Sequence, residues 1–573
     1  MKMIAVKKIG LYSLLIVALA SCSKKEAAIS PEKEAMANTK NITTDILRSP
    51  VGDVVGKLVV GYQGWFGAAG DGSAFNSWRH WAASGTPAPG NQMFELYPDT
   101  REYLTTFQTG YGNLGNGQPA KLFSSWTSQT VAKHFQWMQQ YGIDCAAIQR
   151  FGNYLYVDSR DKAFRDGIVA KARNQAENYD RKFYIMYDIS GWNSFQAEIK
   201  TDWTNAMQVH TNSTAYAKQN GKPVVCIWGI GVSGRPGDVT SWTDVINWFK
   251  AQGCYVIAGT ARGWRTDATN MAAYHAADMI TPWSVGTFSN LAEADTYASV
   301  MQADVAYLDS RGQDYQPVAF PGFAWSNWKP GTAQNMIPRL HGDFMWRQFA
   351  NIRVKGIPSA YVAMFDEYDE ATAIAKAAEN SSMIPTNQYF LTLDADGIAC
   401  SADFYLRLTG DGARMIKQQI PHTSTHPTAH VQASTSTKKL IVGSTVSLTA
   451  LVNGKYVCAD DGGNSPLIAD RTSAGQWEKF TIVDAGNGKI ALRSLANNQY
   501  VCADNGGASP LIANRTVIGS YETFTEVDAG NGNIGLLADV NNKYVCADNS
   551  GNSPLIANRT SVDEWESFIV TTY

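Results

Sequence analysis

Four carboxylates lie within one short segment of the chain. The apolar run 360–365 is followed at once by Asp366, Glu367, Asp369 and Glu370. Glycoside hydrolysis needs one carboxylic acid that protonates the leaving oxygen and a second carboxylate that acts as nucleophile or base. Crowding favours this division of roles, because an ionised neighbour raises the pKa of the next acid. The segment therefore predicts a catalytic pair. We select Glu367 and Glu370, since residues three apart share one face if the chain turns helical there.

Two other interpretations of this acidic segment stay open. Asp366 and Asp369 would cap a helix whose glutamates face water, because acids are common and favourable at a helix start. The other interpretation is a metal site, although no Asp/Asn-Gly loop of the calcium type surrounds the segment. No CxxC or HExxH pattern occurs in the chain, so we expect neither a metal nor a cofactor.

Eight strand-like apolar runs, separated by helix-period segments, must position these carboxylates. Strands buried on both faces read as continuous apolar runs, and strand–helix alternation repeated eight times predicts an α/β fold, the (β/α)₈ TIM barrel, over residues 43–420. The acidic segment then lies at the carboxyl end of the eighth strand, where such barrels place their chemistry. The runs begin at Lys57, Cys145, Lys182, Pro223, Cys254, Met279, Gln316 and Ser359.

The carboxyl ends of these runs change from aliphatic to aromatic and polar residues. Aromatic faces stack on the C–H faces of sugar rings, while charged groups bind the hydroxyls, so the pattern predicts a polysaccharide or oligosaccharide substrate. Any single Trp can instead be a core residue, and a lone His is usually structural. The predicted substrate-binding residues are Tyr62, Trp65, Trp78, His80, Arg150, Asp188, Trp228, Trp283 and Trp325.

The C-terminal region is a threefold repeat. Copies of one motif begin at Asn453, Asn497 and Asn541, 44 residues apart, and strand-like stretches alternate with turns. Three copies of about four short strands each predict an all-β domain, a β-trefoil, over residues 440–573. The equivalent aspartates of the copies either bind a ligand or cap turns. They are Asp460, Asp504 and Asp548.

Residues 421–439 predict a solvated interdomain linker, because Ser, Thr, Pro and Ala dominate and no apolar period is present. Three histidines four residues apart suggest a metal site there, but the prolines and threonines argue against the helix that would align them.

The N-terminus resembles a bacterial lipoprotein leader. Residues 1–22 combine a basic start, a short apolar stretch and a Leu-Ala-Ser-Cys end, which predicts lipidation at Cys22 and a flexible tether over 23–42. An ordinary secretory signal is the alternative. We expect an outer-membrane lipoprotein that faces the periplasm or the cell surface, contacts the membrane through its anchor only, and is a monomer. The net charge of −3 provides no basic field for nucleic acid.

Five short segments carry a family resemblance: "MFDEYDEATAI", "GYQGWF", "SWRHW", "FPGFAWSNW" and "YIMYDISGW". They resemble motifs of glycoside hydrolase family 99, the endo-α-mannosidases, and of relatives near family 71. "MFDEYDEATAI" resembles the family's "NEWxEGTQIE"-type segment, and "GYQGWF" with "SWRHW" is similar to its first strand and Trp-His loop. "FPGFAWSNW" and "YIMYDISGW" resemble its seventh strand and the strand with an acidic sugar-binding residue, here Asp188. The C-terminal repeats resemble fascin-like β-trefoils, which implies binding of either carbohydrate or protein.

The barrel resemblance implies retaining hydrolysis assisted by the substrate's own 2-hydroxyl. Glu367 would deprotonate that hydroxyl, and Glu370 would protonate the leaving oxygen and then activate water. The chain departs from the family motif at several positions, so an α-mannan substrate does not follow. The alternative function is a non-catalytic surface glycan-binding protein on a degenerate hydrolase barrel, which would not need the two glutamates together. The departures are Asp366 for Asn, Tyr368 for Trp, Ala371 for Gly, Ala373 for Gln, and Ala375 for an acid.

Overall fold

A computed structural model of the 573-residue chain describes residues 48–431, 440–486, 488–529 and 532–573. The predicted leader, the lipidation site at Cys22 and the tether at 23–42 lie outside the described residues. Within the described ranges, no helix combines the length and the apolar character that crossing a membrane requires.

A parallel sheet forms the centre of residues 48–431, in the order β10-β9-β8-β7-β5-β4-β1-β12-β11. β10 and β11 lie on one stretch of chain, where Gln316 N–H donates to Ile280 O and Tyr361 N–H donates to Pro317 O. Because both ends of the path meet on this stretch, the sheet is a TIM-like barrel, and each of the eight predicted runs contains one of its strands. The strands are β1 (Leu58–Tyr62), β4 (Cys145–Phe151), β5 (Lys182–Asp188), β7 (Lys222–Ile230), β8 (Tyr255–Ala261), β9 (Met279–Trp283), β10 (Asp314–Tyr315), β11 (Val318–Ala319) and β12 (Ala360–Val362), with β6 (Lys218–Gln219) antiparallel to β7.

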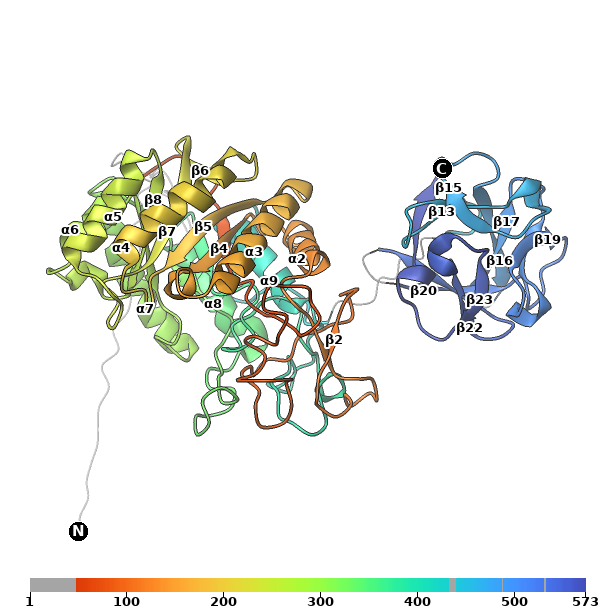
Figure 1. Ribbon diagram of the computed structural model, residues 1–573, viewed down its shortest axis with the longest axis horizontal. Helices are drawn as coiled ribbons and strands as arrows, with labels where there is room; N and C mark the ends of the chain where they lie inside the picture. Colours follow the sequence, from red (N-terminus) through yellow and green to blue (C-terminus); the bar gives the residue numbers. More distant parts are fainter. Residues whose placement is uncertain (1–47, 432–439, 487, 530–531) are drawn as a thin grey trace, which may run out of the picture. The chain divides into compact units, whose positions relative to one another are not determined.

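Helices cover the outside of this sheet, as Figure 1 shows for the run from α4 to α7. The strands are buried on both faces; Val59, Val60, Val224 and Val225, for example, have no exposed surface. This explains why continuous apolar runs identified them. The helices are α2 (Ser128–Gln140), α3 (Ser159–Asn178), α4 (Phe195–Asp202), α5 (Val239–Ala251), α6 (Met271–Ala276), α7 (Leu291–Asp309), α8 (Asp343–Val354) and α9 (Phe404–Ile416).

Two long irregular segments follow β1 and β12 and lie side by side, in orange-red and teal in Figure 1. Isolated bridges join Leu96 to Leu391 and Pro98 to Ala377. The first segment contains the short strands β2 (Phe107–Gln108) and β3 (Lys121–Leu122). The helix considered at the acidic run is not formed, because residues 363–380 contain bends, turns and the isolated bridge at Ala377 but no helix.

The predicted linker is packed against the barrel over its first half. Trp346 Nε1 donates to Thr423 O, Thr428 Oγ1 donates to Asp411 Oδ2, and the His430 carbonyl accepts from Ser401 N–H. Most side chains of residues 421–431 nevertheless stay exposed, so the interdomain linker remains a prediction, with hydrogen bonds between Thr423, Thr428 and His430 and the barrel. Residues 432–439 lie outside the described residues.

Residues 440–573 form an all-β domain of three equivalent parts. β13, β16, β17, β20, β21 and β24 pair antiparallel in a closed ring, and each part adds one hairpin. Cys458, Cys502 and Cys546 are buried and unpaired, as expected for small core residues. The strands are β13 (Thr445–Ala450), β14 (Tyr456–Cys458), β15 (Ile468–Arg471), β16 (Lys479–Gly486), β17 (Lys489–Ser494), β18 (Tyr500–Ala503), β19 (Leu511–Arg515), β20 (Phe524–Asp528), β21 (Ile534–Ala538), β22 (Lys543–Cys546), β23 (Ile556–Arg559) and β24 (Phe568–Thr572).

Candidate active site

Asp366 ties the end of β12 to the end of β1. Its side chain is fully buried, and its two oxygens accept the backbone N–H groups of Gln63 at 2.7 Å and Gly64 at 2.9 Å. Burial raises the pKa of this carboxyl to about 7, and the two backbone hydrogen bonds oppose that rise. Asp366 therefore holds two neighbouring strand ends together and does not cap a helix.

Glu367 is buried, and both of its carboxylate oxygens are hydrogen bonded. Gln63 Nε2 donates to Oε1 at 3.1 Å, and Thr372 Oγ1 donates to Oε2 at 2.9 Å. Burial raises the pKa of Glu367 well above its usual value, the charges of Glu370 and Asp369 add to this, and the Thr372 hydroxyl opposes it. The two hydrogen-bond donors favour the ionised form of Glu367, whereas burial disfavours it.

Glu370 is half-buried, and its pKa is raised to about 8, first by burial and then by the charge of Asp369, while Lys329 opposes the rise. Its backbone carbonyl accepts the N–H of Ala324, which fixes it to the loop after β11. Because the charge of Glu370 also raises the pKa of Glu367, the two carboxyls lie within electrostatic reach of each other. The structure thus brings the predicted pair together.

A tight turn, and not a helix, brings the pair together. The backbone N–H groups of Thr372 and Ala373 donate to the Glu367 carbonyl at 3.1 and 3.0 Å, and Ala371 has a φ of 51°, in the left-handed region. Arg339 supports the turn from outside, since its Nη2 donates to the carbonyls of Ala371 at 2.8 Å and Ala373 at 2.7 Å. The chain therefore reverses over the site and stays close to the ends of β1 and β12.

Asp369 connects the carboxylates to two predicted aromatic residues. Its Oδ2 lies 3.6 Å from His80 Nδ1, and the His80 ring stacks on Trp65 with centroids 4.1 Å apart. Burial, with the positive charges of Arg79 and Arg165, lowers the pKa of His80 to about 3, so the imidazole is neutral at physiological pH. Burial raises the pKa of Asp369 to about 7, so this contact is not a full ion pair.

The other predicted aromatic and acidic residues occupy the carboxyl ends of further strands. Asp188 is buried, accepts Ser190 N–H at 2.7 Å, and has a pKa that burial raises. Trp228 and Trp283 meet edge to face at 5.4 Å, and Trp325 lies on the loop after β11. Trp78 packs edge to face on Phe107 in the long segment after β1, and no contact within the described residues joins it to the carboxylates.

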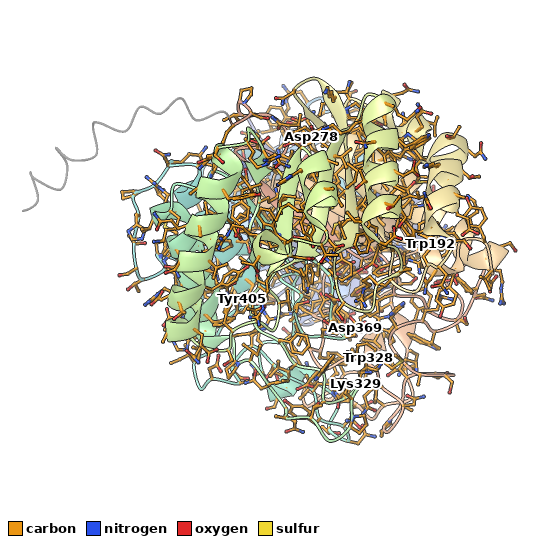
Figure 2. The ribbon with its side chains drawn as sticks, turned by 90° about the vertical axis from the view of Figure 1, so that its left-hand side faces the viewer. Trp192, Asp278, Trp328, Lys329, Asp369 and Tyr405 are labelled. Atoms are coloured by element: carbon orange, nitrogen blue, oxygen red, sulfur yellow. The ribbon has the colours of Figure 1, made fainter. Side chains whose placement is uncertain are left out.

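Figure 2 shows which end of the barrel carries the acidic segment. Asp369, Trp328 and Lys329 gather toward one end, on the same side of the strands as Trp192, which follows β5. Asp278, which precedes β9, lies at the opposite end. The acidic segment therefore occupies the end at which parallel barrels carry their chemistry.

Two predicted substrate contacts are not available to a ligand. Tyr62 is fully buried, and its hydroxyl is hydrogen bonded to His134 Nδ1 at 3.0 Å. Arg150 is also fully buried, and its guanidinium pairs with Asp202 at 2.5 Å and with Asp166 at 2.8 Å. Both predictions are corrected for one reason: these side chains point outward, between the strands and the helices, and not into the barrel.

Sequence reasoning missed several residues that contact the acidic segment. Gln63 follows the first strand directly within the quoted "GYQGWF", so its position at a strand end was a usable signal. Thr372 and Arg339 gave no such signal, because only the folded turn brings them to Glu367 and to the carbonyls of Ala371 and Ala373.

The three aspartates of the C-terminal repeats share one setting. Asp460, Asp504 and Asp548 each pair with an arginine of the same repeat, at 2.5, 2.7 and 2.7 Å. Each also precedes a short 3₁₀ turn, which fits the turn-capping interpretation. Their side chains are only about two-thirds buried (36, 39 and 36 % exposed), so a ligand can still reach them.

The raised carboxyl pKa values predict that the barrel loses stability as pH rises. The folded pKa values of Asp366 and Asp369, about 7, and of Glu370, about 8, all exceed those of an unfolded chain near 4. The folded state therefore binds protons more tightly. The stabilisation of the folded state by these bound protons is complete below about pH 4 and is lost as pH rises through 7 to 8. Urea unfolding followed by tryptophan fluorescence between about pH 5 and 8.5 should show this decline, and Asp369→Asn should reduce its slope. Equal slopes for both proteins would contradict the raised values.

Comparisons with known proteins show similarity to solved structures but assign the chain to no family. Neither the models of protein families nor the curated proteins contain a match to this chain. Among solved structures, the GH99 endo-α-mannosidase from Bacteroides thetaiotaomicron is 14 % identical with a TM-score of 0.48, over 64 % of this chain and 98 % of that one. A glycoside hydrolase-like protein is 14 % identical with a TM-score of 0.39, over 58 % and 98 %. A ricin B-like lectin from Macrolepiota procera, in complex with lactose, is 15 % identical with a TM-score of 0.21, over 23 % and 98 %. At these values the similarities assign no activity, and a functional proposal has to rest on the side chains.

Proposed function

We propose that the protein is a glycoside hydrolase whose catalytic pair is Glu367 and Glu370. The observation that carries this proposal is the placement of two carboxyls three residues apart in one tight turn at the carboxyl end of the last barrel strand, with Gln63 and Thr372 bonded to Glu367. Two coupled carboxyls lose their protons in separate steps, so between these steps one is an acid and the other a base. Glycosidic cleavage requires that state.

The hydrogen bonds suggest how the two glutamates divide the roles. Glu367 has a donor on each carboxylate oxygen, from Gln63 and Thr372, and these hydrogen bonds stabilise its ionised form. No hydrogen bond reaches the Glu370 carboxylate from the described residues, which leaves its proton free for a ligand. We therefore assign Glu367 as the base and Glu370 as the acid, in agreement with the sequence resemblance to families 99 and 71.

The proposed reaction has two steps. Glu367 removes the proton of the substrate 2-hydroxyl, whose oxygen attacks the anomeric carbon while Glu370 gives its proton to the leaving oxygen. Water then opens the resulting 1,2-anhydro sugar at the anomeric carbon. Glu370 takes a proton from this water, and Glu367 returns a proton to the 2-oxygen. The configuration is retained because the anomeric carbon is inverted twice.

The rest of the chain fits an enzyme that meets a polymeric glycan. Trp228 and Trp283, in β7 and β9, add aromatic side chains at the carboxyl ends of the barrel strands, while Trp65 stacks on both His80 and Phe151. We infer a lipid anchor at Cys22, an outer-membrane location and a monomeric state. We also infer that the C-terminal domain is a β-trefoil that binds carbohydrate around its three aspartates.

A screen of the purified chain against glycans tests the proposed activity. Neutral α-mannan, α-glucan and xylan, and acidic glycans, are incubated with the protein, and released reducing ends are measured. We expect release from at least one glycan. Binding without any release would favour the alternative, a surface glycan-binding protein. Failure of the isolated 440–573 fragment to bind any glycan would favour a protein ligand for that domain.

A further inference from the structure

Three basic side chains at the carboxyl end of the barrel have no ion-pair partner among the described residues. Arg235 follows β7, Arg262 follows β8, and Lys329 lies on the loop after β11. Arg150 and Arg265, on neighbouring elements, each have aspartate partners instead. Lys329 and Arg235 act electrostatically on two acids of the candidate site, Glu370 and Asp188, without forming an ion pair with them.

The acids of the same loops form no ion pair with these three cations. Asp238 caps α5 through Ser241, and Asp267 accepts hydrogen bonds from Asn270 at 2.7 Å and Tyr274 at 2.8 Å. Residues 320–342, the loop that carries Lys329, contain no Asp or Glu. The positive charge of these loops is therefore available to a ligand.

Lys329 is presented next to the catalytic pair by a fixed loop. Asn327 Nδ2 donates to the carbonyls of Phe94 and Tyr389, at 2.9 Å each, which anchors the loop on both irregular segments. The Lys329 ammonium lies 4.5 Å from the Trp328 ring centre, and its charge reaches Glu370. In the view of Figure 2, Trp328 and Lys329 lie toward the same end of the barrel as Asp369. The charge of this ammonium thus acts on Glu370, the proposed acid.

Arg235, which follows β7, also lies close to a tryptophan ring and acts on a nearby acid. Its guanidinium carbon lies 5.0 Å from the ring centre of Trp228, its Nε is buried with no partner among the described residues, and its charge reaches Asp188. A buried unpaired donor is costly unless a ligand or water completes it. Each of these two cations therefore accompanies a tryptophan that could hold a sugar ring.

We propose that the substrate is an acidic glycan, one that carries carboxylate or sulfate groups, with Lys329 binding an anionic group beside the cleaved bond and Arg235 binding a second along the chain. This inference rests on the proposed function, since it names the substrate class of the same site. An anionic group can lie beside Glu370, because the raised pKa of that carboxyl, about 8, keeps it neutral near pH 7.

Matched pairs of glycans test this inference with the full chain. Glucuronoxylan is compared with unsubstituted xylan, and fucoidan with chemically desulfated fucoidan, by affinity electrophoresis and by release of reducing ends. We expect a preference of about 10-fold or more for one acidic member. The pair that shows it distinguishes a carboxylate from a sulfate. Lys329→Gln should remove most of this preference, and about 0.5 M NaCl should weaken it. Lys355→Gln, at a half-buried lysine on the far end of α8 whose ammonium donates to Gln302, should leave it unchanged.

The outcomes separate this inference from the proposed function. Binding of an acidic glycan that depends on Lys329, without release of sugar, would refute hydrolysis and keep the inferred ligand class. Release of sugar from a neutral glycan, equal in wild type and Lys329→Gln, would keep hydrolysis and overturn the inference. Absence of a preference in both matched pairs would also overturn it.

Discussion

Replacing Glu370 by Gln should lower kcat/KM on the natural glycan by about 10²- to 10⁴-fold, which is the usual contribution of a positioned general acid. The substitution keeps the shape of the side chain but removes the proton that the leaving oxygen needs. On an aryl glycoside with an acidic phenol as leaving group, the loss should be much smaller, because that group departs without a proton. The wild-type rate should also fall as pH rises through about 8, where Glu370 loses its proton. The variant should lack this alkaline decline.

A matched control separates this effect from a general loss of structure. Glu293→Gln changes an exposed glutamate on α7 that bonds only to neighbouring residues of its own turn, so it should keep wild-type activity. Equal losses for the polymer and the activated aryl glycoside would show that Glu370 does not act as the acid.

Replacing Arg150 by Met should cost about 3–5 kcal/mol of unfolding free energy, as is typical when one partner of a buried ion pair is removed. The change leaves the buried Asp202, which is 1 % exposed, without a cation. Among the described residues, Asp202 then keeps one side-chain donor, the Tyr187 hydroxyl at 2.8 Å. Urea unfolding measures the loss. Adding Asp202→Asn should restore part of it, because the uncompensated buried charge is then gone.

An exposed arginine nearby gives the control for this prediction. Arg160 pairs with Asp158 at 2.8 Å, but its side chain is 59 % exposed, so Arg160→Met should change stability little. If Arg150→Met were as stable as wild type and instead raised KM for the glycan, the original prediction of a substrate contact at Arg150 would be correct.

The barrel was predictable from sequence because its strands are buried on both faces and read as apolar runs. The position of the acidic segment followed from counting those runs. Which side chains face the interior was less predictable, because successive residues of a strand point to opposite sides. Gln149 points inward, where it donates to the Tyr361 hydroxyl at 3.0 Å, while the next residue, Arg150, points outward to Asp202. A polar residue at a strand end is therefore consistent with either face until the register is known.

The turn that shapes the candidate site was beyond sequence reasoning. Acids after a strand suggest a helix start, but tertiary contacts decide the conformation here. Asp366 is held by Gln63 and Gly64, and the turn carbonyls are held by Arg339. These partners are distant in sequence, so no local pattern indicates them. The C-terminal repeats were easier, because three near-identical motifs predict three equivalent structural units.

A crystal structure of the Glu370→Gln variant with an oligosaccharide that the wild type cleaves tests the central claim most directly. We expect the amide introduced at position 370 to lie within hydrogen-bond distance of the glycosidic oxygen. We also expect a Glu367 oxygen within that distance of the 2-hydroxyl of the adjacent sugar. A sugar bound with both side chains out of reach of the glycosidic bond and the 2-hydroxyl would contradict the claim.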